Sequence, residues 1–249
     1  MATYRLAQSG ISIKQDDLEK IGAGHDGIVY KYGDIAIKIL KYDVNFRKTK
    51  NLMTFEKVNY LIETLELNRI VMPIDVILDE DGVYSGYVMN FIDDLYSAKK
   101  IGTSQYKEPG EFSKLDLVRS VQELSDDFLQ LTRNSIIARD INGGSYMFPS
   151  DFIHLCDTDK YIINSRNSGN IHEQNMSSLN FVFAKLLFYE MKKTDSYTIE
   201  SLKLLRNWIK KSSNSKSFIN ELIVEIGNDM NSPISEFADY KFKKILSRN

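Results

Sequence analysis

Two acidic residues, each placed after a short apolar run, are the side chains in this sequence whose position most suggests chemistry. Asp140 follows residues 136–138 and Arg139, and Asp157 follows residues 152–155 and a cysteine. A carboxylate can accept the proton of an attacking hydroxyl. It can also hold a magnesium ion, which prefers carboxylate and phosphate oxygens. We therefore expect Asp140 to act as a proton acceptor and Asp157 to act as a metal ligand.

The segment between these acids predicts a glycine-rich turn followed by a short hairpin. Gly143 and Gly144 favour the turn, and Pro149 and Asp151 mark the tip of the hairpin. An Arg-Asp pair is a common dipeptide, so a buried strand that ends in a solvated turn is the alternative for this segment. What decides between the two is the set of motifs that lies upstream.

A glycine-rich motif lies near the start of the chain. Residues 22–29 have a G-x-G-x-x-G-x-V pattern, which lets the backbone turn freely and approach a triphosphate closely. The same glycine spacing occurs in dinucleotide-binding folds, but there a helix must follow. Here Ile28, Val29 and Tyr30 follow, and β-branched and aromatic residues predict a strand. An ordinary glycine hairpin is the alternative.

Three strands are predicted around this motif, at residues 18–22, 27–32 and 35–40. Gly33 and Asp34 predict a tight hairpin turn before the third strand. Because side chains alternate along a strand, Ala36 and Lys38 share one face and the isoleucines share the other, which packs into a core. The first face offers a small residue for an adenine ring and an ammonium for a phosphate. A solvated strand lysine is the alternative.

The remaining elements are mostly helical. Helices are predicted at residues 55–67, 113–134, 179–191, 198–211 and 232–246. Ser113 and Asp116 form the pattern of a capping box at the start of the second helix. Two further strands are expected at residues 70–78 and 83–91, and the polar stretch 160–178 is expected to be a loop.

The order of these motifs resembles that of protein kinases. Arg139-Asp140 resembles the catalytic loop of the family, and Asp157 resembles the Asp of its Asp-Phe-Gly motif. Residues 22–29 resemble its glycine-rich lid, and residues 36–38 resemble its Val-Ala-Ile-Lys strand. The resemblance covers roughly residues 18–191, and the joint order is far more specific than any single part.

The resemblance implies ATP and magnesium as cofactors. Lys38 would hold the α- and β-phosphates, and Asp140, preceded by Arg139, would orient the acceptor hydroxyl and take its proton. A glutamate on the helix after Lys38 would orient this lysine, with Glu56 as the first candidate and Glu63 as the second.

Residues 87–93 resemble the last strand and hinge of the small kinase lobe. By that match, Met89 is the gatekeeper behind adenine, and the backbones of Asn90 and Ile92 bind the base. The nucleotide-binding residues that the resemblance implies are Gly22, Ala23, Gly24, Gly27, Val29, Ala36, Lys38, Met89, Asn90 and Ile92.

The expected metal site departs from the family pattern. Kinases place an asparagine five residues after the catalytic Asp, and this chain has Ser145 there. We therefore expect the site to depend on Asp157, with Ser145, Asp159 and Asn142 as further ligands. Asn180 replaces the aspartate that usually begins the buried helix of the large lobe, and no Ala-Pro-Glu motif precedes it.

The resemblance predicts an α+β chain with a bilobal, protein kinase-like fold. Residues 1–92 would form a small lobe of antiparallel strands and one helix, and residues 93–249 a larger, mainly helical lobe. The function expected first is an ATP-dependent phosphotransferase resembling protein Ser/Thr kinases, because Arg139 precedes Asp140. A small-molecule kinase, of the type that acts on aminoglycosides or choline, is one alternative, and a nucleotide-binding pseudokinase acting as a binding module is the other.

Composition sets limits on partners. The chain has 249 residues, of which 43% are hydrophobic, so a sizeable core is possible. Its net charge of −2 gives no electrostatic footprint for nucleic acid or an anionic membrane. With one cysteine, Cys156, neither an intramolecular disulfide nor a cysteine zinc cluster can form. We expect a cytoplasmic protein whose partners are ATP and a protein or small-molecule hydroxyl acceptor.

Overall fold

The computed structural model describes residues 2–41, 53–92, 96–97, 113–141, 146–148, 153–163, 168–227 and 230–247. The fold is α+β, as expected. The chain divides into two compact units. The first unit comprises Met1–Leu67, Val71–Asp93 and Thr158–Ile163, and the second comprises Asn68–Ile70, Asp94–Asp157 and Asn164–Asn249. The assignment of these parts as kinase lobes stays a prediction.

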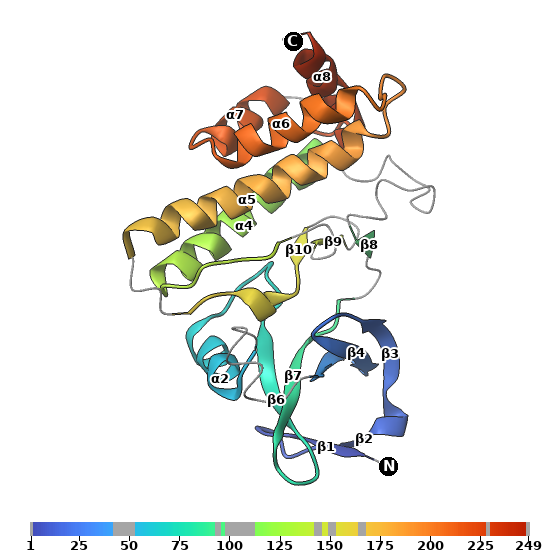
Figure 1. Ribbon diagram of the computed structural model, residues 1–249, viewed down its shortest axis with the longest axis vertical. Helices are drawn as coiled ribbons and strands as arrows, with labels where there is room; N and C mark the ends of the chain where they lie inside the picture. Colours follow the sequence, from blue (N-terminus) through green and yellow to red (C-terminus); the bar gives the residue numbers. More distant parts are fainter. Residues whose placement is uncertain are drawn as a thin grey trace. The chain divides into compact units, whose positions relative to one another are not determined.

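The first unit is built on a curled, antiparallel sheet (Figure 1). Its strand order is β2-β1-β6-β7-β5-β4-β3. The strands are β1 Thr3–Leu6, β2 Ser12–Lys14, β3 Glu19–Ala23, β4 Gly27–Tyr32, β5 Ile35–Leu40, β6 Pro73–Leu78 and β7 Tyr84–Asn90. A short 3-10 turn, Gln15–Asp17, links β2 to β3. The strands expected around the glycine motif and Lys38 are thus confirmed, whereas β1 and β2 were not predicted.

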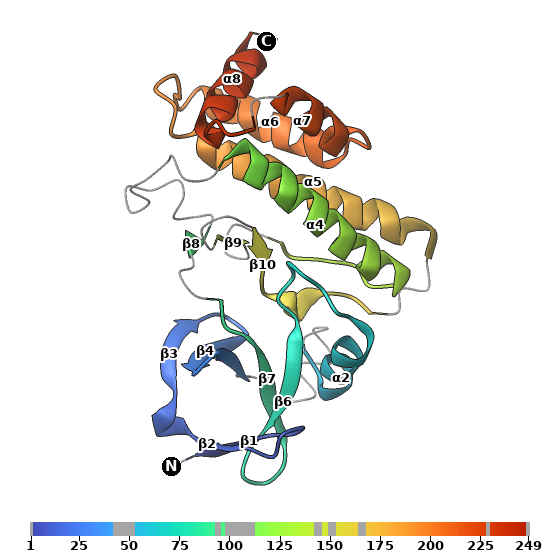
Figure 2. The same ribbon diagram turned by 180° about the vertical axis from the view of Figure 1, so that it is seen from behind.

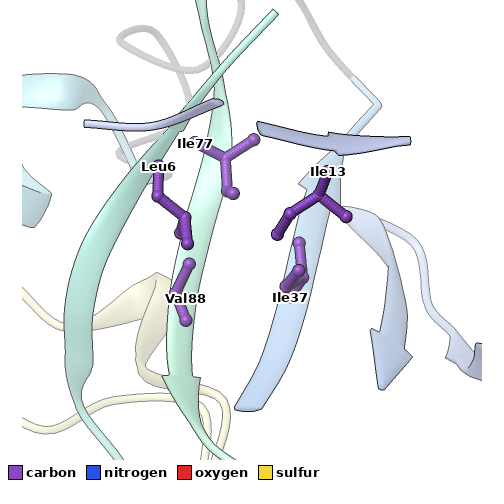
Figure 3. Packing of buried hydrophobic residues seen from close by; sticks show 5 residues of the cluster. All are labelled: Leu6, Ile13, Ile37, Ile77 and Val88. Atoms are coloured by element: carbon purple, nitrogen blue, oxygen red, sulfur yellow. The ribbon is translucent and has the colours of Figure 1, made fainter. Parts of the chain in front are cut away.

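One face of this sheet carries the core of the unit, as the alternation in β5 predicts. Figure 3 shows side chains from five strands meeting there, and the cluster consists of Leu6, Ile13, Ile37, Ile77 and Val88. Ile35 and Ile39 pack against it from the same face of β5. Full burial of an isoleucine is worth roughly 1.5–3 kcal/mol. The core therefore fixes which face of β5 is left for Lys38.

Helix α2, Phe55–Thr64, packs on β6 in the same unit. Thr54 caps its first turn, because the threonine hydroxyl accepts a hydrogen bond from the backbone N–H of Lys57 at 3.3 Å. Val58 and Leu61 are buried on one side of the helix. The helix ends three residues earlier than predicted, since Leu65 already has extended backbone angles.

The second unit contains the other helices of the described residues. They are α4 Lys114–Arg133, α5 Ser168–Met191, α6 Ser201–Ser213, α7 Phe218–Ile226 and α8 Ile234–Leu246. The long helix α5 packs against α4, α6 and α8 (Figure 2). A small sheet of β8 Tyr96–Ser97, β9 Tyr146–Phe148 and β10 His154–Leu155 completes the unit. The predicted hairpin between Asp140 and Asp157 is β9–β10, and its expected tip at Pro149 and Asp151 lies outside the described residues.

Helix α4 begins as its sequence predicts. Ser113 Oγ accepts from the backbone N–H of Asp116 at 3.1 Å, and the Asp116 carboxylate accepts from the Ser113 backbone N–H at 2.9 Å. These two bonds form the expected capping box. None of the described helices is both long and apolar enough to cross a membrane.

The predicted helices differ from the structure in two places. Residues 168–178 were expected to be loop, but α5 begins at Ser168. Two residues of that stretch are buried, Ile171 and Asn175. Asn175 is polar and hydrogen-bonds to backbone groups, so the stretch carries too few buried apolar residues to show a helical period. Helix α7 was missed, although Phe218, Leu222 and Ile226 are buried at helical spacing.

Candidate functional site

Lys38 lies in the middle of β5, on the face opposite to the core. Its direct neighbours across the sheet are Val29 of β4 and Tyr87 of β7. Directly opposed residues share a face, so the three side chains form one row. Lys38 is only 8% exposed, and its ammonium donates to Oδ2 of Asp159 at 2.5 Å. A lysine this buried needs an anionic partner, and Asp159 supplies it.

Asp159 is held by three side chains of the first unit. It is 1% exposed. Besides the bond from Lys38, its Oδ1 accepts from the Tyr87 hydroxyl at 2.5 Å. Its backbone carbonyl accepts from the Lys57 ammonium of α2 at 2.7 Å. Asp159 was expected as a metal ligand, but in this structure both of its carboxylate oxygens accept hydrogen bonds from protein donors.

Helix α2 presents a cation to this cluster. Lys57 is buried, and that burial lowers the pKa of its ammonium from 10.5 to about 8. The charge of Asp159 opposes the shift and that of Lys160 adds to it. Glu56 and Glu63, the expected partners of Lys38, are both exposed on α2. Their pairing with Lys38 stays a prediction, and the described partner of Lys38 is Asp159.

The glycine-rich turn joins β3 to β4, and its glycines differ in what they require. A Cβ on Gly27 would lie 2.7 Å from the carbonyl oxygen of Ile39, so close packing of β5 demands glycine there. A Cβ on Gly24 would meet no protein atom within 4 Å, and at Gly22 the nearest would be Val29 at 3.9 Å. Packing within the fold is therefore enough to require glycine at position 27. At position 24 the fold leaves open space, and packing does not require glycine.

One ion pair and two hydrogen bonds hold this turn in place. Asp26 pairs with His25 at 3.0 Å and with the Lys160 ammonium at 3.1 Å. Burial tends to raise the pKa of Asp26, but the hydrogen bonds from His25 and Lys160 outweigh it and hold the pKa below its ordinary value. The Lys41 ammonium donates to the carbonyl of Gly24 at 2.6 Å. Residues 159 and 160 therefore contact both Lys38 and the glycine-rich turn.

The residues expected to surround adenine lie on the same sheet. Ala36 is directly opposite Met89 in the β5–β7 pair, on the face of Lys38. Strand β7 ends at Asn90, and Ile92 follows the strand. Ala23 pairs with Ile28 across the glycine-rich turn. Gly22, Val29, Ala36, Lys38 and Met89 therefore share one sheet, while the roles expected for the Asn90 and Ile92 backbones stay predictions.

The second unit carries the Arg139-Asp140 loop, which α5 holds in place. The Asn175 side chain, fully buried, accepts from the backbone N–H of Ala138 at 2.9 Å and donates to the carbonyl of Ile136 at 2.8 Å. Arg139 donates to Gln174 Oε1 at 3.3 Å. Asp140 is exposed and has a left-handed backbone with φ of 59°. The loop thus presents a carboxylate to solvent from a backbone that is fixed from behind.

Asn180 does not contact this loop through any described hydrogen bond. Its amide donates to the carbonyl of Ser215 at 2.8 Å and more weakly to that of Ser213. Among the described residues, Asn175 and Ser178, both earlier on α5, bind the loop backbone.

Asp157 lies two residues after the end of β10 and is the last residue of this segment that belongs to the second unit. It is exposed, and its φ of 69° is left-handed, as at Asp140. An exposed carboxylate at the end of a strand fits the oxygen chemistry that magnesium prefers. Ser145 and Asn142 lie outside the described residues. Within the described ranges, no group of three or more His, Cys, Asp or Glu side chains is placed to hold a metal.

Sequence reasoning missed Tyr87, Lys57 and Asn175. Tyr87 could have been found from strand register, because it is directly opposite Lys38. Lys57 is adjacent to the predicted Glu56, but nothing in the sequence tells which of two neighbouring helix residues turns inward. Asn175 lies in the stretch that was expected to be loop. No family model matches this chain, and no curated protein matches it either.

Proposed function

We propose that this protein is an ATP-dependent phosphotransferase with a bilobal, protein kinase-like fold, and that it transfers the γ-phosphoryl group of ATP to a hydroxyl acceptor. The observation that carries the proposal is the buried Lys38, held on the sheet face opposite to the core and on the strand after the glycine-rich turn. A buried ammonium with an anionic partner is a group that can bind phosphate.

The chemistry assigned to each residue follows from its type. Lys38 would hold the α- and β-phosphates, and the open space at Gly24 would admit phosphate oxygens to the backbone. Asp157 would hold magnesium, which bridges phosphate oxygens and neutralises their charge. Asp140 would orient the acceptor hydroxyl and take its proton, and Asn175 would fix the loop that carries Asp140. Ala36 and Met89 would line the adenine side.

A second candidate is a nucleotide-binding module without turnover. The observation in its favour is that Asp159 already neutralises Lys38 and uses both carboxylate oxygens. A triphosphate would have to displace this carboxylate before Lys38 could bind it. If displacement of Asp159 assembles no metal site, the protein would bind nucleotide and transfer nothing.

The test combines binding with turnover on the full chain. ATP with magnesium should raise the melting temperature, because a ligand at about 100 times its Kd adds about 2.7 kcal/mol of stability. ATP consumption should require a hydroxyl acceptor and should be abolished in Asp157→Ala. A rise in melting temperature without ATP turnover, on any acceptor and with any metal, would favour the nucleotide-binding module over the phosphotransferase. If ATP neither raises the melting temperature nor is consumed, the proposed nucleotide site is wrong.

A further inference from the structure

Two pockets lie side by side in the second unit, next to Asp140. The first has a volume of about 390 Å³ and is lined by residues 137–141, the adjacent face of α5 and Ser213. The second, about 340 Å³, extends along α5 to the turn after α6. Both are lined by Ser177 and Ser213. Each is large enough for a small ligand, and the shared residues make them neighbours.

Two serine hydroxyls in the lining of these pockets have hydrogen-bond acceptors left for a ligand. The Ser178 hydroxyl donates to the carbonyl of Ala138 at 3.1 Å, and the Ser213 hydroxyl donates to the carbonyl of Ile209 at 2.8 Å. A hydroxyl has one hydrogen to donate but two lone pairs to accept with. Since both hydrogens are already used, these serines present lone pairs to a ligand.

Asn180 adds a further acceptor. It lines the second pocket and is 3% exposed. Its amide nitrogen donates to the carbonyl of Ser215 at 2.8 Å, while its Oδ1 is buried and has no hydrogen-bond partner among the described residues. A buried acceptor left unsatisfied costs about 1–3 kcal/mol. This oxygen is closed off in the structure, so a ligand would remove that cost only by shifting the lining far enough to donate a hydrogen bond to it.

The charges around the pockets indicate an uncharged ligand. Lys216, in the second pocket, pairs with Glu173 at 2.8 Å, so the two charges cancel. Arg139 and Asp140 are the charged residues that line the first pocket, and they are of opposite sign. Neither a strongly cationic nor a strongly anionic molecule would find a complementary surface.

We propose that these two pockets bind the acceptor, and that the acceptor is a small, neutral, polyhydroxylated molecule. This inference rests on the proposed phosphotransferase function. Each hydroxyl of a polyol can donate to the lone pairs of Ser178 and Ser213 and can also accept from a donor in the lining such as Arg139. A small neutral molecule also suits the pocket volumes and the balanced charges of the lining.

One ligand hydroxyl reacts beside Asp140 while the others occupy the second pocket. Its oxygen forms a bond to the γ-phosphorus of ATP, and the bond from that phosphorus to the β,γ-bridging oxygen breaks, which releases ADP. The proton of the hydroxyl passes to the Asp140 carboxylate. The product is a phosphate monoester of the polyol.

The test uses the full chain and measures binding without ATP. The probes are myo-inositol, sorbitol, glucose and sucrose, observed by saturation-transfer NMR at millimolar concentration. At least one should bind, and Ser177→Leu, which fills the wall common to both pockets, should weaken that binding by roughly tenfold or more. Ser213→Ala removes only a hydroxyl and serves as a gentler second variant. Ser125→Leu, on α4 and outside both pockets, is the matched control and should bind normally.

The outcomes separate this inference from the proposed function. Polyol binding that is lost in Ser177→Leu supports it, as does ATP-dependent phosphorylation of the same polyol. No binding by any probe, or binding equal in Ser177→Leu and wild type, overturns it. Phosphorylation of Ser/Thr peptides alone also overturns it and leaves the phosphotransferase intact. Polyol binding without any ATP binding or turnover overturns the phosphotransferase and retains the pockets as a polyol site.

Discussion

The ammonium of Lys38 lies 2.5 Å from Oδ2 of Asp159, and both side chains are almost fully buried. Residues separated by 121 positions in the sequence thus form a buried ion pair. The net contribution of such a pair to stability can be small, but removal of one partner leaves an uncompensated buried charge. The ion pair also engages the Lys38 ammonium, which would have to bind phosphate in the proposed function.

We predict that Asp159→Asn lowers the free energy of unfolding by about 3–5 kcal/mol, the usual cost of breaking a buried pair. Two buried ammonium groups, those of Lys38 and Lys57, would then lack their carboxylate neighbour. If the proposed function is right, ATP phosphates can take its place, so ATP should stabilise the variant more than the wild type. Urea denaturation with and without ATP measures both effects.

Asp157→Asn is the matched control for the measurement without ATP, because the proposed function makes Asp157 a metal ligand and so involves it in ATP binding. Asp157 is exposed and lies two residues away in the same segment. Asparagine tolerates the left-handed backbone angle at this position, so no strain is added. Its stability should remain within about 0.5 kcal/mol of the wild type. Equal losses in the two variants would contradict a specific role for the buried pair.

The lowered pKa of Lys57 predicts a pH dependence of stability. Between about pH 8 and 10.5 the unfolded chain keeps a proton on this lysine that the folded chain has lost. The unfolded state then binds more protons, so the free energy of unfolding rises with pH in that window. Below pH 8 both states are protonated and the contribution no longer changes. The expected gain is about 2 kcal/mol between pH 8 and pH 10.

Lys57→Met isolates this effect, because methionine keeps an unbranched chain and does not titrate. The stability of the wild type relative to the variant should rise from pH 8 to pH 10, as measured by urea denaturation at each pH. Lys203→Met, on an exposed and unrelated stretch of α6, controls for general effects of losing a lysine. A difference between wild type and Lys57→Met that stays flat over this range would contradict a depressed pKa.

The sequence predicted the local features of the first unit well and its long-range contacts poorly. Strand β5 and its two faces follow from alternation, and the core cluster around Ile37 lies where that alternation puts it. The contact of Asp159 with Lys38 depends on how residues 158–163 return to the first unit, which no local pattern encodes. Helix α5 was misjudged at its start for a related reason. Of the two buried residues in its early turns, Ile171 and Asn175, one is polar, so these turns carry too few apolar residues for a search for apolar periods to find them.

Two glycines of the same turn should respond oppositely to alanine. Gly27→Ala would force a Cβ to within 2.7 Å of the Ile39 carbonyl, so we expect a stability loss of about 1–3 kcal/mol. Gly24→Ala meets open space, and its backbone φ is not left-handed, so stability should hold or rise by up to about 1 kcal/mol.

Nucleotide binding then tests what the open space at Gly24 is for. If phosphate oxygens approach the backbone there, Gly24→Ala should weaken ATP binding while leaving the fold intact. Isothermal titration calorimetry on Gly24→Ala and wild type measures the change in affinity. Unchanged ATP affinity in a stable Gly24→Ala protein would show that the turn does not contact the phosphates.

Asp140→Asn tests the proposed proton acceptor most directly. Asp140 is exposed at a left-handed position, which asparagine also tolerates, so the substitution removes the carboxylate with little strain. The loop backbone remains bound by Asn175 through the groups of Ala138 and Ile136. Turnover should fall by roughly 10²–10⁴, the usual contribution of a positioned general base. ATP affinity should barely change, since this residue faces the acceptor in the proposed mechanism.

Steady-state turnover and ATP titration measure the loss of the proton acceptor and any loss of ATP binding separately. Asn175→Ala is the comparison variant, because it loosens the loop and keeps the Asp140 carboxylate. If Asp140→Asn lost ATP binding and turnover together, the carboxylate would be structural and the proton would need another acceptor.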